Sequence, residues 1–138
     1  MITGYVSGVF DMFHIGHLNI IVKSRARCDR LIVGAVTDEV VEGIKGRKPI
    51  IALEERLEIL RGLRDVDEVV VDRYADKYDT WKELHFDVIF KGDDWRGTAK
   101  GLKLESDLAA HGARVEYFPY TSHTSSSLLR EVLSGLAH

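Results

Sequence analysis

The chain alternates between short apolar runs and segments whose apolar residues recur at helical spacing. Apolar runs of the kind found in buried parallel strands cover residues 2–9, 31–37, 69–71, 88–90 and 115–118. Amphipathic helical patterns cover residues 18–25, 53–63, 102–109 and 128–133. This alternation predicts βαβ units with right-handed crossovers. The expected fold is therefore α/β and Rossmann-like, a five-stranded, mostly parallel sheet with helices on both faces.

In such a sheet, functional residues are expected in the segments that directly follow the strands. Ligands bind beyond the carboxyl ends of parallel strands, at the point where the strand order reverses. No internal repeat, low-complexity tract or linker interrupts the sequence. We therefore expect one domain over residues 1–138, with its functional residues after the predicted strands.

Two histidines follow the first predicted strand, in the segment 8–17 (GVFDMFHIGH). His14 and His17 stand three residues apart, so in a first helical turn their imidazoles would project to the same side. Free N–H groups and the positive end of the helix dipole lie there too, which favours a phosphate. Gly16 would let a ligand approach the backbone. Helix capping and a metal site are alternatives, although further ligands at recognisable metal-site spacing do not accompany the pair.

Three further polar segments follow predicted strands. Residues 45–49 (KGRKP) form a basic loop, which suits phosphates but is also typical of solvated surface charge. Residues 91–97 (KGDDWRG) carry two carboxylates that suit a hydroxyl, an amine or a metal ion, or that simply cap the next helix. Residues 119–127 (PYTSHTSSS) place hydroxyls at a helix start, as a phosphate cradle or as an N-cap.

Composition excludes several classes of protein. With 45% hydrophobic and 30% charged residues in 138, the chain has the composition of a globular protein. A net charge of -3 argues against a general nucleic-acid or membrane surface, since both need excess Lys and Arg. We find neither a bilayer-spanning apolar run nor a signal peptide, and Cys28 has no disulfide partner, so a cytoplasmic protein is expected.

Three motifs together resemble the cytidylyltransferase family of the HxGH nucleotidyltransferase superfamily, and within it the glycerol-3-phosphate cytidylyltransferases. These motifs are residues 14–17 (HIGH), 64–69 (RDVDEV) and 92–95 (GDDW), and the resemblance covers nearly the whole chain. It implies the HxGH nucleotidyltransferase fold and an enzyme that condenses CTP with sn-glycerol 3-phosphate to give CDP-glycerol and pyrophosphate. It also implies Mg²⁺ with the triphosphate, a homodimer, and a role in teichoic acid or capsule biosynthesis.

Other substrates fit the same residues. ATP in place of CTP is compatible with the HIGH motif, and phosphocholine, phosphoethanolamine or a heptose phosphate are alternative acceptors. A nucleotide-binding module without catalysis is a third hypothesis.

The resemblance assigns a role to each candidate residue. It gives as catalytic residues His14, His17, Lys45 and Arg56. Lys48 is an alternative to Lys45, and ion pairing with nearby acids is an alternative for the arginines. The nucleotide-binding residues are Gly8, Val9, Phe10, Gly16, Asp94, Thr121, Ser125 and Ser126. The substrate-binding residues are Asp11, Lys45 and Arg64, and no protein metal ligand is assigned.

The segment 119–127 departs from the family pattern at two positions. Tyr120 stands where the family carries an arginine in its RTEGISTT segment, and His123 replaces the glycine. Arg130, one helical turn beyond Ser126, is a candidate to compensate, or else an exposed helix residue.

Overall fold

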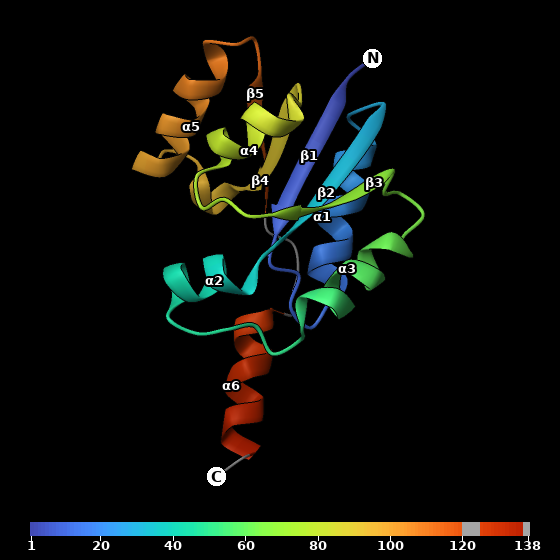
Figure 1. Cartoon of the computed structure of the whole chain (residues 1–138), viewed down its shortest axis with the longest axis vertical. Helices are drawn as coiled ribbons and strands as arrows, with labels where there is room; N and C mark the ends of the chain where they lie inside the picture. Colours follow the sequence, from blue (N-terminus) through green and yellow to red (C-terminus); the bar gives the residue numbers. More distant parts are fainter. Residues whose placement is uncertain (120–124, 137–138) are drawn as a thin grey trace.

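A single sheet of five strands forms the centre of the computed structural model, which describes residues 1–119 and 125–136 (Figure 1). The strand order is β3-β2-β1-β4-β5, and every neighbouring pair is parallel. This confirms the predicted α/β fold with a parallel sheet. The strands are β1 (Thr3–Gly8), β2 (Arg30–Val36), β3 (Glu68–Asp72), β4 (Val88–Gly92) and β5 (Arg114–Phe118).

Helices cover both faces of the sheet, because both faces are apolar and need burial. On one face α1 and α3 bury Ile21, Leu57 and Leu60 against the strands. On the other face α4 and α5 pack, and Leu104 and Leu108 of α5 enter the core there. In the described part of the chain, the helices are α1 (Ile15–Arg25), α2 (Asp38–Lys45), α3 (Leu53–Arg61), α4 (Lys77–Leu84), the short 3-10 helix η1 (Asp93–Trp95), α5 (Ala99–Ala109) and α6 (Ser126–Leu136).

The sequence pattern does not predict α2 and α4. Both have eight residues, and few of their apolar positions are buried. Each begins with a side chain that caps its first turn, Thr37 for α2 and Asp76 for α4. Each is followed by a residue in the left-handed conformation, Gly46 and His85. Local capping therefore marks both ends of these short helices.

The carboxyl ends of β1 and β4 mark the reversal of strand order. The chain runs from β1 outward through β2 to β3, then crosses back to β4 on the other side of β1. The connections after β1 and β4 therefore leave toward opposite faces and open a crevice between them. Helix α6 lies beyond this edge of the sheet and projects away from it (Figure 1). Among the described helices, none is long and apolar enough to cross a membrane.

Candidate active site

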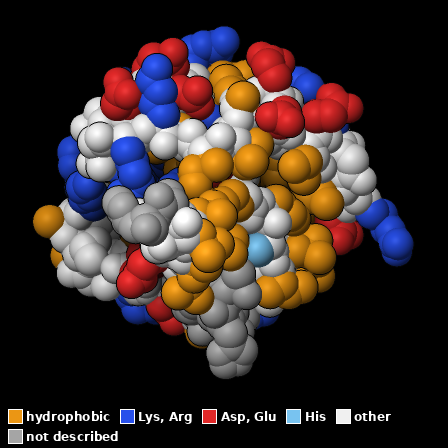
Figure 2. All heavy atoms as spheres, turned by 90° about the horizontal axis from the view of Figure 1, so that it is seen from below, with side chains coloured by type: hydrophobic (Ala, Val, Ile, Leu, Met, Phe, Trp, Pro, Cys, Tyr) orange, Lys and Arg blue, Asp and Glu red, His pale blue; other side chains and the backbone are white. Residues whose placement is uncertain are grey.

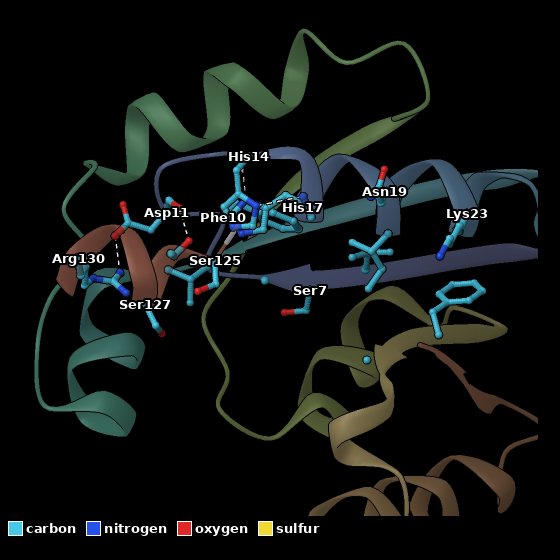
Figure 3. A pocket seen from close by; sticks show the side chains of 18 of the residues that line it. Ser7, Phe10, Asp11, His14, His17, Asn19, Lys23, Ser125, Ser127 and Arg130 are labelled. Carbon is cyan, nitrogen blue, oxygen red and sulfur yellow. Dashed lines mark hydrogen bonds and ion pairs between the residues drawn. The ribbon is translucent and has the colours of Figure 1, made fainter. Parts of the chain in front are cut away.

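A cavity of about 340 Å³ opens at the reversal point of the sheet (Figure 3). Its walls come from the carboxyl ends of β1 and β4, one side of α1, the end of α2, the end of β5 and the start of α6. The lining residues that the sequence predicted are Gly8, Val9, Phe10, Asp11, His14, Gly16, His17, Lys45, Ser125 and Ser126. The fold thus gathers at one place most of the residues that the motifs singled out.

His14 and His17 hold each other in place at the start of α1. Nδ1 of His14 accepts a hydrogen bond from the backbone N–H of Gly16 at 3.0 Å. The backbone N–H of His14 in turn donates to Nδ1 of His17 at 3.2 Å. This reciprocal arrangement is a capping box in which two imidazoles act as the acceptors. The rings stack on each other, with centroids 3.9 Å apart (Figure 3).

This geometry decides which ring nitrogen carries the proton. Since Nδ1 of each imidazole accepts from a backbone N–H, Nε2 of the neutral ring is the donor. Burial lowers the pKa of His14. Burial, together with the neighbouring charge of His14, lowers the pKa of His17 to about 4, against the opposing effect of Asp11. At neutral pH the pair therefore presents neutral Nε2–H donors beside the positive end of a helix, a setting that suits phosphate oxygens.

The turn between β1 and α1 is strained in a way that fixes these histidines. Phe10 and Met12 adopt left-handed backbone conformations, with φ of 55° and 49°, which L-residues rarely occupy. The turn brings the ring of Phe10 edge-on to His17, with centroids 5.3 Å apart. A Cβ atom at position 8 would lie 3.0 Å from the Phe10 ring, a tight contact that favours glycine here. The strain thus serves to position an imidazole.

Asp11 joins three segments around the cavity. Its carboxylate accepts hydrogen bonds from the backbone N–H groups of Ile50 and Ile51, both at 2.8 Å, and pairs with Arg130 of α6. Burial alone would raise the pKa of Asp11, but these hydrogen bonds and the charge of Arg130 lower it. The predicted substrate contact through Asp11 is therefore not what the structure presents. Both carboxylate oxygens are engaged within the protein, where they tie the loop after α2 and the start of α6 to the turn after β1.

Lys45, rather than Lys48, lines the cavity. It is the last residue of α2, and Gly46 follows it in a left-handed conformation that turns the chain into the basic loop. Burial lowers the pKa of Lys45, and so do the charges of Arg130 and Arg47, against the opposing effect of Asp11. Several cations therefore face one acidic group at this end of the cavity.

The serines at the start of α6 cap and anchor that helix. The Oγ atom of Ser125 accepts from the N–H of Leu128 at 3.0 Å, as an N-cap does. The hydroxyl of Ser126 donates to the backbone carbonyl of Asp11 at 2.6 Å. Both serines line the cavity, whereas the predicted Thr121 lies outside the described residues.

Arg56 is the clearest correction to the sequence-based prediction. Its side chain is 0% exposed, and it does not line the cavity. The guanidinium donates to the carbonyls of Val9, Val36 and Ile51 at 2.8–3.0 Å and pairs with Asp38. An arginine that satisfies so many internal acceptors holds the surrounding loops together. The structure therefore gives Arg56 a positioning role in place of the catalytic contact that we predicted.

Arg64 and Asp94 lie away from the cavity wall. Arg64 is exposed in the turn between α3 and β3, at the amino end of the sheet, because this turn precedes a parallel strand instead of following one. Arg64 therefore lies at the edge of the sheet opposite the cavity, away from the substrate that we predicted it would contact. Asp94 belongs to η1 and is exposed, yet its Oδ1 atom lies 2.7 Å from where a Cβ of Gly92 would be. Gly92 lines the cavity, whereas Asp94 does not.

Three polar lining residues escaped the sequence-based prediction, namely Ser7, Asn19 and Lys23, and Arg130 lines the cavity with them (Figure 3). Asn19 and Lys23 continue the helical face that begins at Gly16, so a helical projection of α1 contains the signal that finds them. The sequence offered Arg130 as a candidate to compensate for Tyr120, with an exposed helix residue as the alternative. Only the tertiary structure places it in the cavity, because 113 residues separate it from His17.

Comparisons with known proteins agree with this geometry. A family model described as cytidylyltransferase-like matches residues 5–132. An FAD synthase from Thermococcus sibiricus is 36% identical over 121 residues, which cover 87% of this chain and 80% of that protein. The bifunctional protein HldE of Granulibacter bethesdensis is 41% identical over 95 residues, 68% of this chain but 20% of that protein. A lipopolysaccharide core biosynthesis protein from Thermoplasma volcanium has a structure with a TM-score of 0.74 at 27% identity, covering 90% of this chain and 99% of that one.

Proposed function

Because the chain belongs to the cytidylyltransferase-like family of nucleotidyltransferases, we propose that it transfers a nucleotidyl group from ATP or CTP to a phosphorylated alcohol or a sugar phosphate and releases pyrophosphate. The observation that carries the proposal is the pair of imidazoles in the crevice. Their Nδ1 atoms are held by backbone N–H groups, which leaves two Nε2–H donors for phosphate oxygens. The cavity also offers Lys45 and the free N–H groups at the start of α1.

The proposed reaction is a displacement at the α-phosphorus. A phosphate oxygen of the acceptor forms a new bond to this phosphorus, and the bond to the bridging oxygen of the β-phosphate breaks. Pyrophosphate leaves with the electron pair. The residues of the cavity need only position the two substrates and stabilise the charge on the phosphate oxygens. His14 and His17 do so as hydrogen-bond donors, and no proton transfer through them is required.

The relatives support an acceptor other than glycerol 3-phosphate. FAD is an adenylyl group joined to a phosphorylated alcohol, and the two phosphates form its pyrophosphate link. The similarity to an FAD synthase therefore favours ATP and a phospho-alcohol. The similarity to a lipopolysaccharide core biosynthesis protein favours a sugar phosphate. We therefore place these two acceptor classes first.

CDP-glycerol synthesis from CTP and sn-glycerol 3-phosphate is the second candidate. The observation in its favour is the GDDW segment after β4, whose Gly92 lines the cavity. A role in teichoic acid or capsule synthesis depends on this candidate.

We further propose that Mg²⁺ enters with the triphosphate. Within residues 1–119 and 125–136, no three His, Cys, Asp or Glu side chains converge as a metal site. Asp11, the acidic residue among the described lining residues, already accepts hydrogen bonds from Ile50, Ile51 and Arg130. Mg²⁺ commonly keeps several waters and binds through substrate phosphates, so it would neutralise the charge of the triphosphate itself. A cytoplasmic location, where these triphosphates occur, is part of the proposal.

The exposed side of α6 supports the proposal that the protein is a homodimer. None of residues 126–136 is fully buried. Figure 2 shows hydrophobic side chains gathered at this end of the molecule. Along α6, Leu128, Val132, Leu133 and Leu136 are 46–77% exposed. A two-fold axis beside the helix would bury this strip against itself.

The test is pyrophosphate release from a grid of substrates with magnesium. ATP, CTP, GTP and UTP are each combined with flavin mononucleotide, heptose phosphate, glycerol 3-phosphate, phosphocholine and phosphoethanolamine. We expect ATP or CTP to dominate with one acceptor. The product of that pair, identified by mass spectrometry, distinguishes the two candidates.

A matched pair of variants ties the activity to this cavity. His17→Ala is expected to lower kcat about 100- to 1,000-fold, since it removes one preorganised donor. Lys82→Ala, an exposed change on α4, is expected to leave the rate unchanged. If the protein binds a triphosphate but no acceptor in the grid gives pyrophosphate, it is a nucleotide-binding module and the proposed reaction is wrong.

A further inference from the structure

Lys91 is a cation close to the reversal point of the sheet, on the side of α4 and α5. Val6 of β1 pairs with Phe90 of β4. The next residues of these two strands, Ser7 and Lys91, are therefore neighbours, with backbones about 5 Å apart. Side chains alternate along a strand, so both lie on the face where Tyr5 is buried. Since Ser7 lines the cavity, Lys91 stands one strand away from its wall.

The ammonium group of Lys91 has no counter-ion among the described residues. Its Nζ atom lies 3.8 Å from the centroid of the Trp95 ring, and no residue of the described part of the chain forms a hydrogen bond or an ion pair with it. The residue is only partly exposed. A ring face attracts a cation but does not neutralise its charge. The charge of Lys91 is therefore open to an anion.

The acidic residues near Lys91 do not balance this charge. The carboxylate of Asp72, at the end of β3, is buried. It accepts a hydrogen bond from Ser7 at 2.9 Å and pairs with Lys77 at 3.1 Å. Asp94 is exposed, so solvent screens its charge. Two lysines therefore face one engaged carboxylate, an imbalance that an anionic ligand relieves.

The electrostatics of Lys91 agree with this geometry. Burial is the largest cause that lowers the pKa of Lys91 to about 8, and the charges of Lys77 and Lys100 lower it too. Asp72 and Asp94 oppose this shift. Lys91 is thus mostly charged at neutral pH and mostly neutral above pH 8. A bound anion would stabilise the charged form.

We propose that Lys91 binds the phosphate of the acceptor, from the α4 and α5 side of the reversal point. The inference rests on the proposed nucleotidyl transfer. In a displacement at phosphorus, the attacking and the leaving oxygens lie roughly in line on opposite sides of the α-phosphorus. His14, His17 and Lys45 line the cavity that would hold the triphosphate. A cation beyond Ser7 is placed to bind the second substrate, and an ammonium group does so as a compact point charge.

The experiment is steady-state kinetics of the wild type and of Lys91→Met, with the triphosphate and the acceptor that react best in the substrate grid. Methionine keeps an unbranched side chain beside Trp95 and removes the charge. We expect the KM for the acceptor to rise about 10- to 100-fold, because a charged hydrogen-bonding partner is lost. The KM for the triphosphate should stay unchanged. Lys82→Met, an exposed change on α4, is the matched control and should alter neither constant.

The pH dependence of the reaction gives a second readout. Lys91 is charged below its pKa of about 8 and neutral above it. In the wild type, kcat/KM for the acceptor should therefore fall about tenfold between pH 7 and pH 9, as the ammonium group loses its proton. Lys91→Met has no such group and should lack this fall. The wild-type profile remains informative even where the variant does not fold.

The outcomes distinguish this inference from the proposed function. An active wild type with an unchanged acceptor KM in Lys91→Met overturns the role of Lys91 and leaves nucleotidyl transfer intact. A parallel rise of both KM values with a lowered melting temperature also overturns it, because Lys91 then only packs beside Trp95. Where the variant does not fold, a flat wild-type profile from pH 7 to pH 9 does the same. If the wild type releases no pyrophosphate with any pair, the proposed function fails and this inference fails with it.

Discussion

The environment of His17 makes stability depend on pH in a specific window. In the folded protein its pKa is about 4, below the ordinary value of 6.5, because burial and His14 disfavour the charged form. Between these two values the unfolded chain binds a proton that the folded chain does not. Stability is therefore fully present above pH 6.5 and is lost as the pH falls toward 4.

We expect the melting temperature to fall by several degrees between pH 7 and pH 5. His17→Asn should reduce this fall, since an amide can still accept from the N–H of His14 but does not titrate. The measurement is a series of thermal melts of both proteins across this range. An equal pH dependence in the two would show that His17 does not cause it.

Arg56 gives a second prediction about a single residue. Its removal leaves three backbone carbonyls and Asp38 without their donor in the interior. Arg56→Met is therefore expected to lower the free energy of unfolding by about 3–5 kcal/mol. Urea denaturation measures this loss, with exposed Arg61→Met as the control. A variant as stable as the wild type but without turnover would restore the catalytic role that the sequence suggested.

Among the elements, β1 and β2 pack closely at Gly34 of β2, where a side chain would collide with Tyr5 of β1. Tyr5 of β1 reaches across β2, and its hydroxyl donates to Asp72 at the end of β3 at 2.5 Å. Asp72 also accepts from Ser7 and Thr80 and pairs with Lys77. Because Ser7 lines the cavity, this buried network connects the sheet to the wall of the site.

Gly34→Ala tests this arrangement of strands. A Cβ at position 34 would lie 2.0 Å from the hydroxyl of Tyr5, so the tyrosine or the strand must move. We expect a loss of about 3 kcal/mol in the free energy of unfolding. In a double-mutant cycle, Tyr5→Phe should recover about 1 kcal/mol of it, since the oxygen at the closest contact is gone. Strictly additive effects would show that Gly34 acts independently of Tyr5.

For the whole molecule, the testable property is the proposed homodimer. Wild-type protein should sediment at twice the 15.6 kDa mass of the chain. Leu133→Glu places a charge in the exposed apolar strip of α6 and should shift the equilibrium to monomers. Leu102→Glu, at a leucine of similar exposure on α5, is the matched control. If the wild type sediments as a monomer, the dimer is excluded at that concentration.

The sequence by itself determined the strands of the sheet and the position of His14 and His17 in the site. Strands in a buried parallel sheet are apolar throughout, and α1 follows its strand after a short turn, so periodicity found the five strands and placed His14 and His17. Local spacing was sufficient because these residues act within one helical turn.

Only the tertiary structure decided what the charged residues do. Arg56 and Arg130 are both arginines on amphipathic helices, yet one is sealed among backbone carbonyls and the other lines the cavity. Arg64 lies at the opposite edge of the sheet. A charged side chain interacts mainly with the groups that lie within a few ångströms of it. In a parallel sheet with helical crossovers, those groups come from distant segments of the chain. Asp11 and Arg130, for example, form an ion pair although they lie 119 residues apart.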